Sequence, residues 1–159
     1  MRITTILMAA LLAAMVPVTA IFAQPPANFS GTWKQNNERC DPKRTGDVTL
    51  LIERQDPKLT VETTILRGSD APRHAIQSYT TDGLQSISIG VDGDEFHTSV
   101  VWRDQSLIFT VEEHEDGRII RSKEIWTLID DGSALKRVRE DADSGKQRTL
   151  VYTKISPNP

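Results

Sequence analysis

Asp-Gly pairs recur along this chain between short runs of β-prone residues, and their spacing limits the folds that the chain can adopt. The pairs occur at 82–83, 92–93, 116–117 and 131–132, and Ser144-Gly145 gives a fifth turn signal. A tight hairpin turn needs a positive φ angle, which glycine adopts without a Cβ clash. Asp56-Pro57-Lys58 predicts a further turn because proline fixes its own φ angle. The sequence therefore predicts strands joined by short turns.

Nine runs between these turns are long enough to form strands. They cover residues 48–54, 59–66, 74–80, 84–89, 96–102, 106–112, 118–128, 134–140 and 149–155. Several alternate, so that Leu107, Phe109 and Val111 share one face, and the odd positions of 59–65 are the more apolar ones. We find no long helical periodicity and no connection long enough for parallel pairing.

With an opening run at 28–35, the pattern indicates about ten antiparallel strands. Closing such a meander into a barrel removes its exposed edges. The predicted fold class is therefore all-β, an antiparallel up-and-down barrel or barrel-like sandwich of about 8–10 strands.

The first 23 residues differ from the rest of the chain. Arg2 is their only charge, a largely apolar stretch follows over 3–16, and Ala20 and Ala23 offer two cleavage sites. This order is typical of a secretory signal peptide, and the apolar stretch is shorter than the ~20 residues of a membrane-spanning helix, the alternative. We expect a signal peptide over 1–23, one soluble domain over 24–159 without a transmembrane segment, and export to the periplasm or the extracellular space.

Net charge and cysteine content limit the binding partners and the disulfide bonds that this chain can have. The net charge is −3, and basic residues are interspersed with acidic ones, which argues against a nucleic-acid partner. Cys40 is the only cysteine, so an internal disulfide is excluded. It is either a loop thiol without a role or one half of an intermolecular disulfide.

The two ends of the predicted barrel resemble the calycin superfamily, which contains the lipocalins and the fatty-acid-binding proteins. Phe29-Ser30-Gly31-Thr32-Trp33-Lys34 is similar to their first strand, and residues 149–154 are similar to the last strand of fatty-acid-binding proteins. Further similarity to secreted bacterial lipocalin-like proteins is carried by residues 56–62, 79–83 and 126–132. The resemblance implies that Gly31 lets the first strand bend and that the Trp33 indole closes one end of the barrel.

The chain departs from fatty-acid-binding proteins at two places. They carry an arginine in the last strand, two residues before the tyrosine, that holds the ligand carboxylate, and here Leu150 occupies this position. Only residues 36–47 separate the first two strands, which is too short for the helix-turn-helix lid of that family. We expect the lid to be absent or reduced to one turn.

Catalytic and metal-binding patterns are missing from the sequence. There is no Gly-x-Ser-x-Gly elbow and no Gly-rich phosphate loop, and the acidic run 112–116 is interpreted as a solvated hairpin tip. His74, His97 and His114 have no paired spacing, so we predict no metal site, although residues on different strands can meet in space. We expect no cofactor, and we keep a hydrolase or isomerase only as a third alternative.

Two functions remain. The leading hypothesis is a barrel that binds a small apolar or amphipathic ligand, with Tyr79, Trp102, Phe109 and Tyr152 as candidate contacts. The alternative is a non-enzymatic module with a filled core that binds an envelope protein of unknown identity. We expect most charged strand residues, namely Arg121, Lys123, Glu124, Arg137 and Arg139, to lie on the outer face. A cavity of several hundred Å³ would favour the ligand-binding hypothesis.

Overall fold

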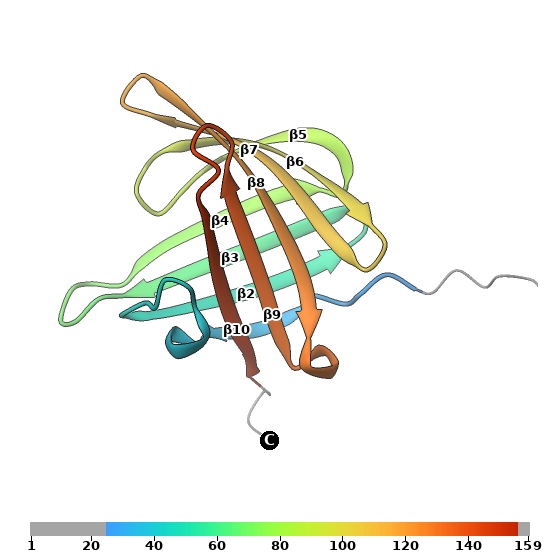
Figure 1. Cartoon of the computed structure of the whole chain (residues 1–159), viewed down its shortest axis with the longest axis horizontal. Coiled ribbons are helices and arrows are strands. Elements are labelled where there is room, and N and C mark those ends of the chain that lie inside the picture. The colour runs from blue at the N-terminus through green and yellow to red at the C-terminus, as the bar shows by residue number, and fades with distance from the viewer. Residues whose placement is uncertain (1–24, 156–159) are drawn as a thin grey trace, which may run out of the picture.

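The computed structural model describes residues 25–155, which form an all-β barrel (Figure 1). The strands are β1 (Gly31–Gln35), β2 (Asp47–Gln55), β3 (Lys58–Leu66), β4 (Arg73–Thr80), β5 (Asp82–Ile89), β6 (Glu95–Arg103), β7 (Ser106–Glu115), β8 (Arg118–Ile129), β9 (Ala134–Asp141) and β10 (Gln147–Ile155). Two short 3₁₀ helices complete the elements, η1 (Asn37–Arg39) and η2 (Asp130–Gly132). The predicted fold class is confirmed. The proposed signal peptide and its cleavage sites lie outside the described residues.

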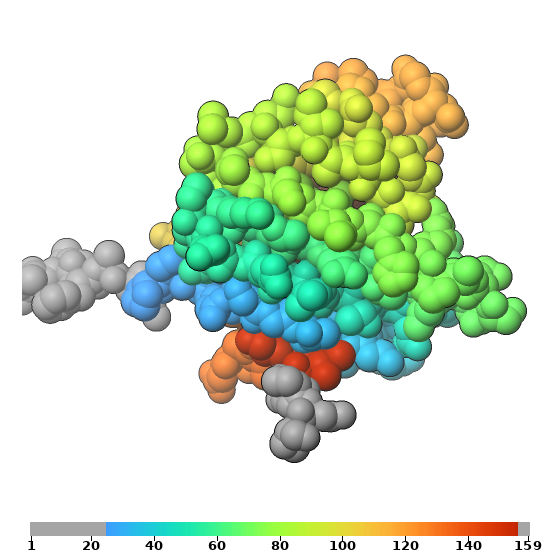
Figure 2. All heavy atoms as spheres, turned by 180° about the vertical axis from the view of Figure 1, so that it is seen from behind, coloured from blue at the N-terminus to red at the C-terminus, as the bar shows by residue number. Residues whose placement is uncertain are grey.

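Strands that follow one another in the chain pair antiparallel, except β4 and β5, and β1 also pairs antiparallel with β10. The order is β4-β3-β2-β1-β10-β9-β8-β7-β6-β5, so β1 pairs with both β2 and β10. β4 and β5 are the two edges of this sheet, and their atoms form adjoining bands on the rear face (Figure 2). A side-chain contact bridges them, since Gln77 Nε2 lies 3.5 Å from Ser88 Oγ. The barrel is thus nearly closed, with one seam.

The strand predictions hold closely, with two corrections. Asp82-Gly83 is not a hairpin turn: the chain turns at Thr81, and Asp82 begins β5, where the register with β6 shifts before Gln85. The acidic run is not wholly a hairpin tip, because β7 continues to Glu115 and pairs with β8 along that length. The turn itself is confined to Asp116-Gly117.

Aromatic side chains fill one end of the barrel. Trp33 is fully buried, and its Nε1 donates a hydrogen bond to the Phe29 carbonyl oxygen at 2.9 Å. The Phe29 ring lies 5.9 Å from Trp102 and 6.4 Å from Trp126, centroid to centroid. Lys154 Nζ lies 5.1 Å from the centroid of the Trp33 ring. This aromatic floor closes the end of the barrel where β1 begins and β10 ends.

The opposite end carries the connections β1–β2, β3–β4, β5–β6, β7–β8 and β9–β10. In the first of these, η1 is a single turn, where fatty-acid-binding proteins have a helix-turn-helix lid. Cys40 ends this turn, is buried, and its Sγ lies 3.2 Å from the Asn36 carbonyl oxygen. Its burial disfavours a disulfide to a second chain. Over residues 25–155, no helix is long and apolar enough to cross a membrane.

Candidate binding cavity

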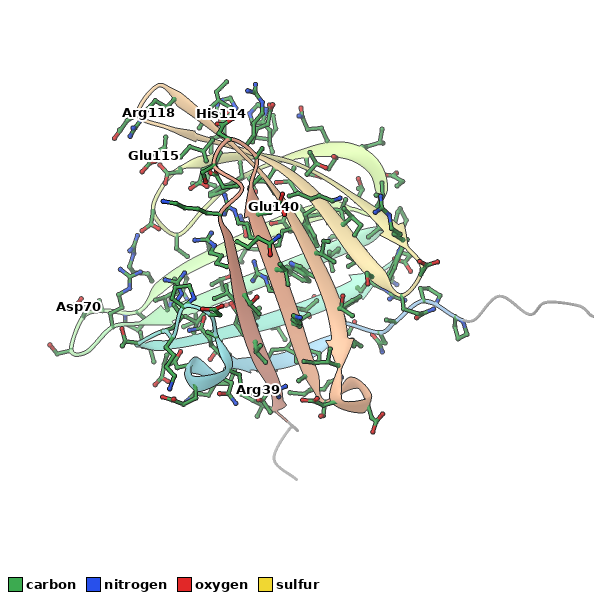
Figure 3. The ribbon with its side chains drawn as sticks, viewed as in Figure 1. Arg39, Asp70, His114, Glu115, Arg118 and Glu140 are labelled. Carbon is green, nitrogen blue, oxygen red and sulfur yellow. The ribbon has the colours of Figure 1, made fainter. Side chains whose placement is uncertain are left out.

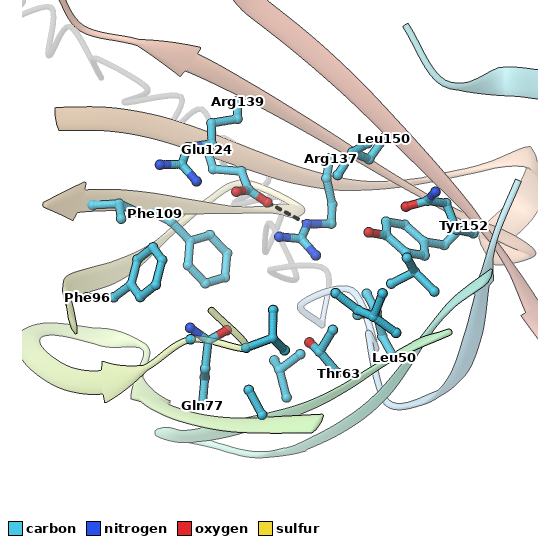
Figure 4. A pocket seen from close by; sticks show the side chains of 18 of the residues that line it. Leu50, Thr63, Gln77, Phe96, Phe109, Glu124, Arg137, Arg139, Leu150 and Tyr152 are labelled. Atoms are coloured by element: carbon cyan, nitrogen blue, oxygen red, sulfur yellow. Dashed lines mark hydrogen bonds and ion pairs between the residues drawn. The ribbon is translucent and has the colours of Figure 1, made fainter. Parts of the chain in front are cut away.

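A cavity of about 390 Å³ lies inside the barrel, above the aromatic floor (Figure 4). Strand alternation explains its wall, because every second side chain of each strand points inward. The apolar part of this wall comprises Val48, Leu50, Val61, Ile65, Phe96, Phe109, Val111, Trp126 and Leu150. A ligand of this size would therefore meet mainly aliphatic and aromatic surface over part of its length.

A buried ion pair crosses the polar part of the cavity. Arg137 Nε on β9 donates a hydrogen bond to Glu124 Oε1 on β8 at 2.5 Å, and the two side chains are 19% and 10% exposed. Trp126 Nε1 donates to the same carboxylate oxygen at 2.5 Å. The Arg137 guanidinium also stacks on the Trp126 ring, 4.6 Å from its centroid. These contacts fix Arg137 at the centre of the cavity wall.

Burial and charge act against each other on this pair. Burial raises the pKa of Glu124, but the charge and hydrogen bond of Arg137 lower it by a larger amount. The net pKa therefore lies below the ordinary value. Burial lowers the pKa of Arg137, and Glu124 reverses that effect. Both groups are therefore ionised at neutral pH. Burial also raises the pKa of Tyr79 and Tyr152, so their hydroxyls stay protonated and able to donate a hydrogen bond.

A second buried pair lies closer to the open end. Arg139 Nη2 donates a hydrogen bond to Glu113 Oε2 at 2.6 Å, and its Nε donates to Ser122 Oγ at 2.8 Å. Arg139 lies directly opposite Arg148 on β10. Burial lowers the pKa of Arg148, and the charges of Arg139 and Arg44 lower it further. Positive charge is thus concentrated where the cavity opens.

The arginines outnumber the acids along this cavity. Its lining contains Arg44, Arg67, Arg137, Arg139 and Arg148 but only Asp92 and Glu124. Among residues 25–155, Arg44, Arg67 and Arg148 have no ion-pair partner within 4.0 Å. The lining therefore has a positive surplus although the whole chain is acidic.

The structure brings three of the four candidate contact residues together. Tyr79, Phe109 and Tyr152 line the cavity, and the Tyr79 and Phe109 rings are 5.5 Å apart. Trp102 lies in the aromatic floor outside the cavity, between Phe29 and the Arg54 guanidinium, which is 5.0 Å from its ring centroid. Whether the three cavity residues contact a ligand stays a prediction.

The expectation that most charged strand residues face outward is wrong for Glu124, Arg137 and Arg139, which line the cavity. Arg121 and Lys123 lie on the outer face, since they alternate with Ser122 and Glu124. The alternation of inward and outward side chains along each strand could have predicted these inward positions. Glu124 is two residues from Trp126, and Arg137 is two residues from Leu135, and both of these neighbours are buried.

No family model and no curated protein matches the sequence. Among solved structures, "REP1-NXSQ fatty acid transporter" is 12% identical with a TM-score of 0.61, covering 81% of this chain and 97% of that one. Secretory abundant heat soluble protein 4 from Ramazzottius varieornatus is 12% identical with a TM-score of 0.62, covering 86% and 100%. The fatty-acid-binding protein of Schistosoma mansoni, in complex with arachidonic acid, is 14% identical with a TM-score of 0.56, covering 80% and 96%.

The fold is that of the fatty-acid-binding proteins. Leu150 stands where the family resemblance places an arginine, and its direct cross-strand partner on β9 is Arg137. The neighbouring strand therefore places the Arg137 guanidinium in the cavity beside Leu150.

Proposed function

We propose that this chain binds a small amphipathic ligand with an anionic group inside its barrel. The observation that carries the proposal is an apolar cavity of about 390 Å³ whose polar residues have a positive surplus. This volume lies within the range of small-molecule sites, about 300–1,000 Å³. A hollow interior also favours ligand binding over the alternative of an interaction module with a filled core.

The division of the wall defines the ligand. An acyl chain or ring system fits against Leu50, Val61 and Phe109, and an anionic group fits near the arginines at the open end. Arg44 and Arg148 are the best candidates for that group, because Arg137 and Arg139 are already paired with carboxylates. A ligand anion would relieve the repulsion between Arg148 and Arg139. Two of the structural neighbours are described as a fatty acid transporter and as an arachidonic acid complex, which agrees with this chemistry.

A matched pair of fluorescent probes tests the proposal. We expect a dansyl-labelled undecanoic acid to bind with enhanced fluorescence. Its methyl ester should bind with an affinity at least about tenfold lower. Arg148→Gln should weaken binding of the acid and leave binding of the ester unchanged. Arg118→Gln, a control at an exposed residue of the β7–β8 hairpin (Figure 3), should change neither.

A cavity-filling variant provides the second arm. Ala75 lines the cavity, so Ala75→Trp should occupy it and abolish binding of both probes. Absence of binding by the unmodified chain, or equal binding by the Ala75→Trp variant, would exclude the cavity as the site. Equal affinity for acid and ester would exclude the anionic group as a determinant.

We also propose that the chain is exported and that its mature form begins near residue 24 or after Ala20. The support is the basic start, short apolar stretch and alanine cleavage sites of the first 23 residues. N-terminal sequencing of the protein recovered from the periplasmic and extracellular fractions of its host tests this. An intact Met1 in the cytoplasmic fraction would contradict it.

A further inference from the structure

Two histidines from different strands meet on the outer face of the barrel. His97 on β6 and His114 on β7 stack with ring centroids 4.4 Å apart and planes 20° apart. Glu95 is two residues before His97 on the same face, and it is the cross-strand partner of His114. His97 Nε2 lies 2.7 Å from Glu95 Oε1. The strand register therefore places two imidazoles and a carboxylate side by side.

One nitrogen of this cluster has no partner. His114 Nε2 is buried and makes no hydrogen bond in the structure. A buried polar atom without a partner costs free energy, so its occurrence in a folded protein calls for an explanation. Figure 3 shows His114 beside Glu115 and Arg118 near the hairpin between β7 and β8.

We propose that Glu95, His97 and His114 bind a divalent transition-metal ion of the Zn²⁺ class. One ligand atom from each of the three lies within 4.8 Å of the others. Two nitrogens bound to one tetrahedral Zn²⁺ are about 3.4 Å apart, at metal–nitrogen distances of about 2.0–2.1 Å. Small rotations about the side-chain bonds would bring the three groups to this geometry, and the Glu95 side chain is 47% exposed.

The donor set selects the class of metal. Two neutral imidazoles and one carboxylate suit Zn²⁺ and its neighbours, whereas Ca²⁺ and Mg²⁺ prefer sites built from oxygen ligands. The ion would satisfy His114 Nε2 and take the place of the hydrogen bond between His97 Nε2 and Glu95 Oε1. Three protein ligands leave a fourth position for water. Glu112, the cross-strand partner of His97, adds negative charge nearby and is itself held by Arg121 Nε at 2.9 Å.

The test is calorimetric titration of Zn²⁺ into the untagged chain in chelator-treated buffer, with Cys40→Ser as the background to remove the thiol. We expect one Zn²⁺ per chain, and a loss of affinity of about tenfold or more in His97→Asn and in His114→Asn. His74→Asn is the matched control, because His74 lies on β4 and contacts Thr64 instead. It should bind Zn²⁺ as the background does.

Co²⁺ gives an independent readout, since it reports its ligands through its visible absorption. We expect a Co²⁺ spectrum typical of low coordination number in the background chain, reduced in Glu95→Gln and absent in the double variant of His97 and His114. The metal-free thermal unfolding midpoints of all variants should coincide. A loss of metal binding then reflects loss of the ligands and not loss of the fold. No saturable binding below about 1 mM, equal loss in His74→Asn, or a Co²⁺ spectrum unchanged by the double variant would overturn the proposal.

Discussion

Trp33 carries several structural roles in one side chain. It is fully buried, its Nε1 is hydrogen bonded to the Phe29 carbonyl oxygen, and Lys154 covers its ring. Removing it leaves a cavity in the aromatic floor, an unpaired carbonyl oxygen and an unsupported strand start. The floor depends on this residue more than on Trp102, which is only half-buried.

Trp33→Ala should therefore lower the free energy of unfolding by about 3–5 kcal/mol. Trp102→Ala, the matched control, should cost less because part of its ring already faces solvent. Urea denaturation of both variants measures the difference. Equal losses would show that Trp33 is an ordinary packing residue without a special role in closure.

Glu124 makes stability depend on pH. Its pKa in the folded chain lies below the ordinary value of 4.5, because Arg137 outweighs the effect of burial. A lowered pKa means that the carboxylate stabilises the fold fully above about pH 4.5 and loses that contribution as the pH falls through the folded value.

Glu124→Gln tests this dependence. The variant should be less stable at neutral pH by about 3–5 kcal/mol, since Arg137 is left without its partner. Its stability should also fall less steeply than that of the parent chain between pH 5 and pH 3. Urea denaturation across this pH range measures both effects. Parallel pH profiles would show that other carboxylates cause the acid sensitivity.

At the scale of elements, β1 bends at a residue that only glycine suits. Gly31 has φ of +134°, a backbone region that side-chain-bearing residues rarely adopt. A Cβ built there lies 2.8 Å from Lys154 Cε, the end of a flexible side chain that can move away. The backbone, and not the contact, should therefore set the cost of substitution.

Gly31→Ala is expected to destabilise the chain by about 1–3 kcal/mol, as for other strained backbone positions. A double-mutant cycle with Lys154→Ala separates the two causes. If the backbone sets the cost, the two effects add to within about 0.5 kcal/mol. A double variant much more stable than the sum would assign the cost to the Lys154 contact instead.

Elements were predictable because each depends on local residues. The alternation of Leu107, Phe109 and Val111, and the turn at Asp116-Gly117, are visible within one hairpin. The bounds of the nine runs fall within two residues of the observed strands, except that β7 continues three residues further, to Glu115. The ion pair between Glu112 on β7 and Arg121 on β8 joins the two strands of this longer hairpin.

The candidate sites were less predictable because they depend on register. A charged residue in a strand faces the cavity or solvent according to its phase, and Glu124 is tolerated inside only because β9 places Arg137 against it. His97 and His114 are 17 positions apart in the numbering and meet only because β6 and β7 pair in one register. The cavity volume depends on how far opposite walls stand apart, which no single strand encodes.

At the scale of the whole molecule, the barrel wall separates two candidate binding sites. The cavity and its arginines lie inside, and the Glu95, His97 and His114 cluster lies on the outer face of β6 and β7. Alternating residues of the same strands serve both, since Phe96 and Thr98 point into the cavity between Glu95, His97 and Ser99. Substitutions at one site should therefore leave the other intact.

The seam between β4 and β5 has a consequence for how fast the chain folds. Every strand pair in the described barrel joins neighbours in the chain except β1 with β10, which brings together Thr32 and Ile155. Linking the ends at that point, and opening the chain between Thr81 and Asp82, would give the order β5 to β10 followed by β1 to β4. In that circular permutant every pairing becomes local.

Because folding slows as the sequence separation of contacts grows, the permutant should refold faster than the parent chain while keeping the same barrel. Stopped-flow tryptophan fluorescence would measure both rates under the same conditions. A refolding rate equal to or below that of the parent would mean that joining the two ends of the chain does not limit folding.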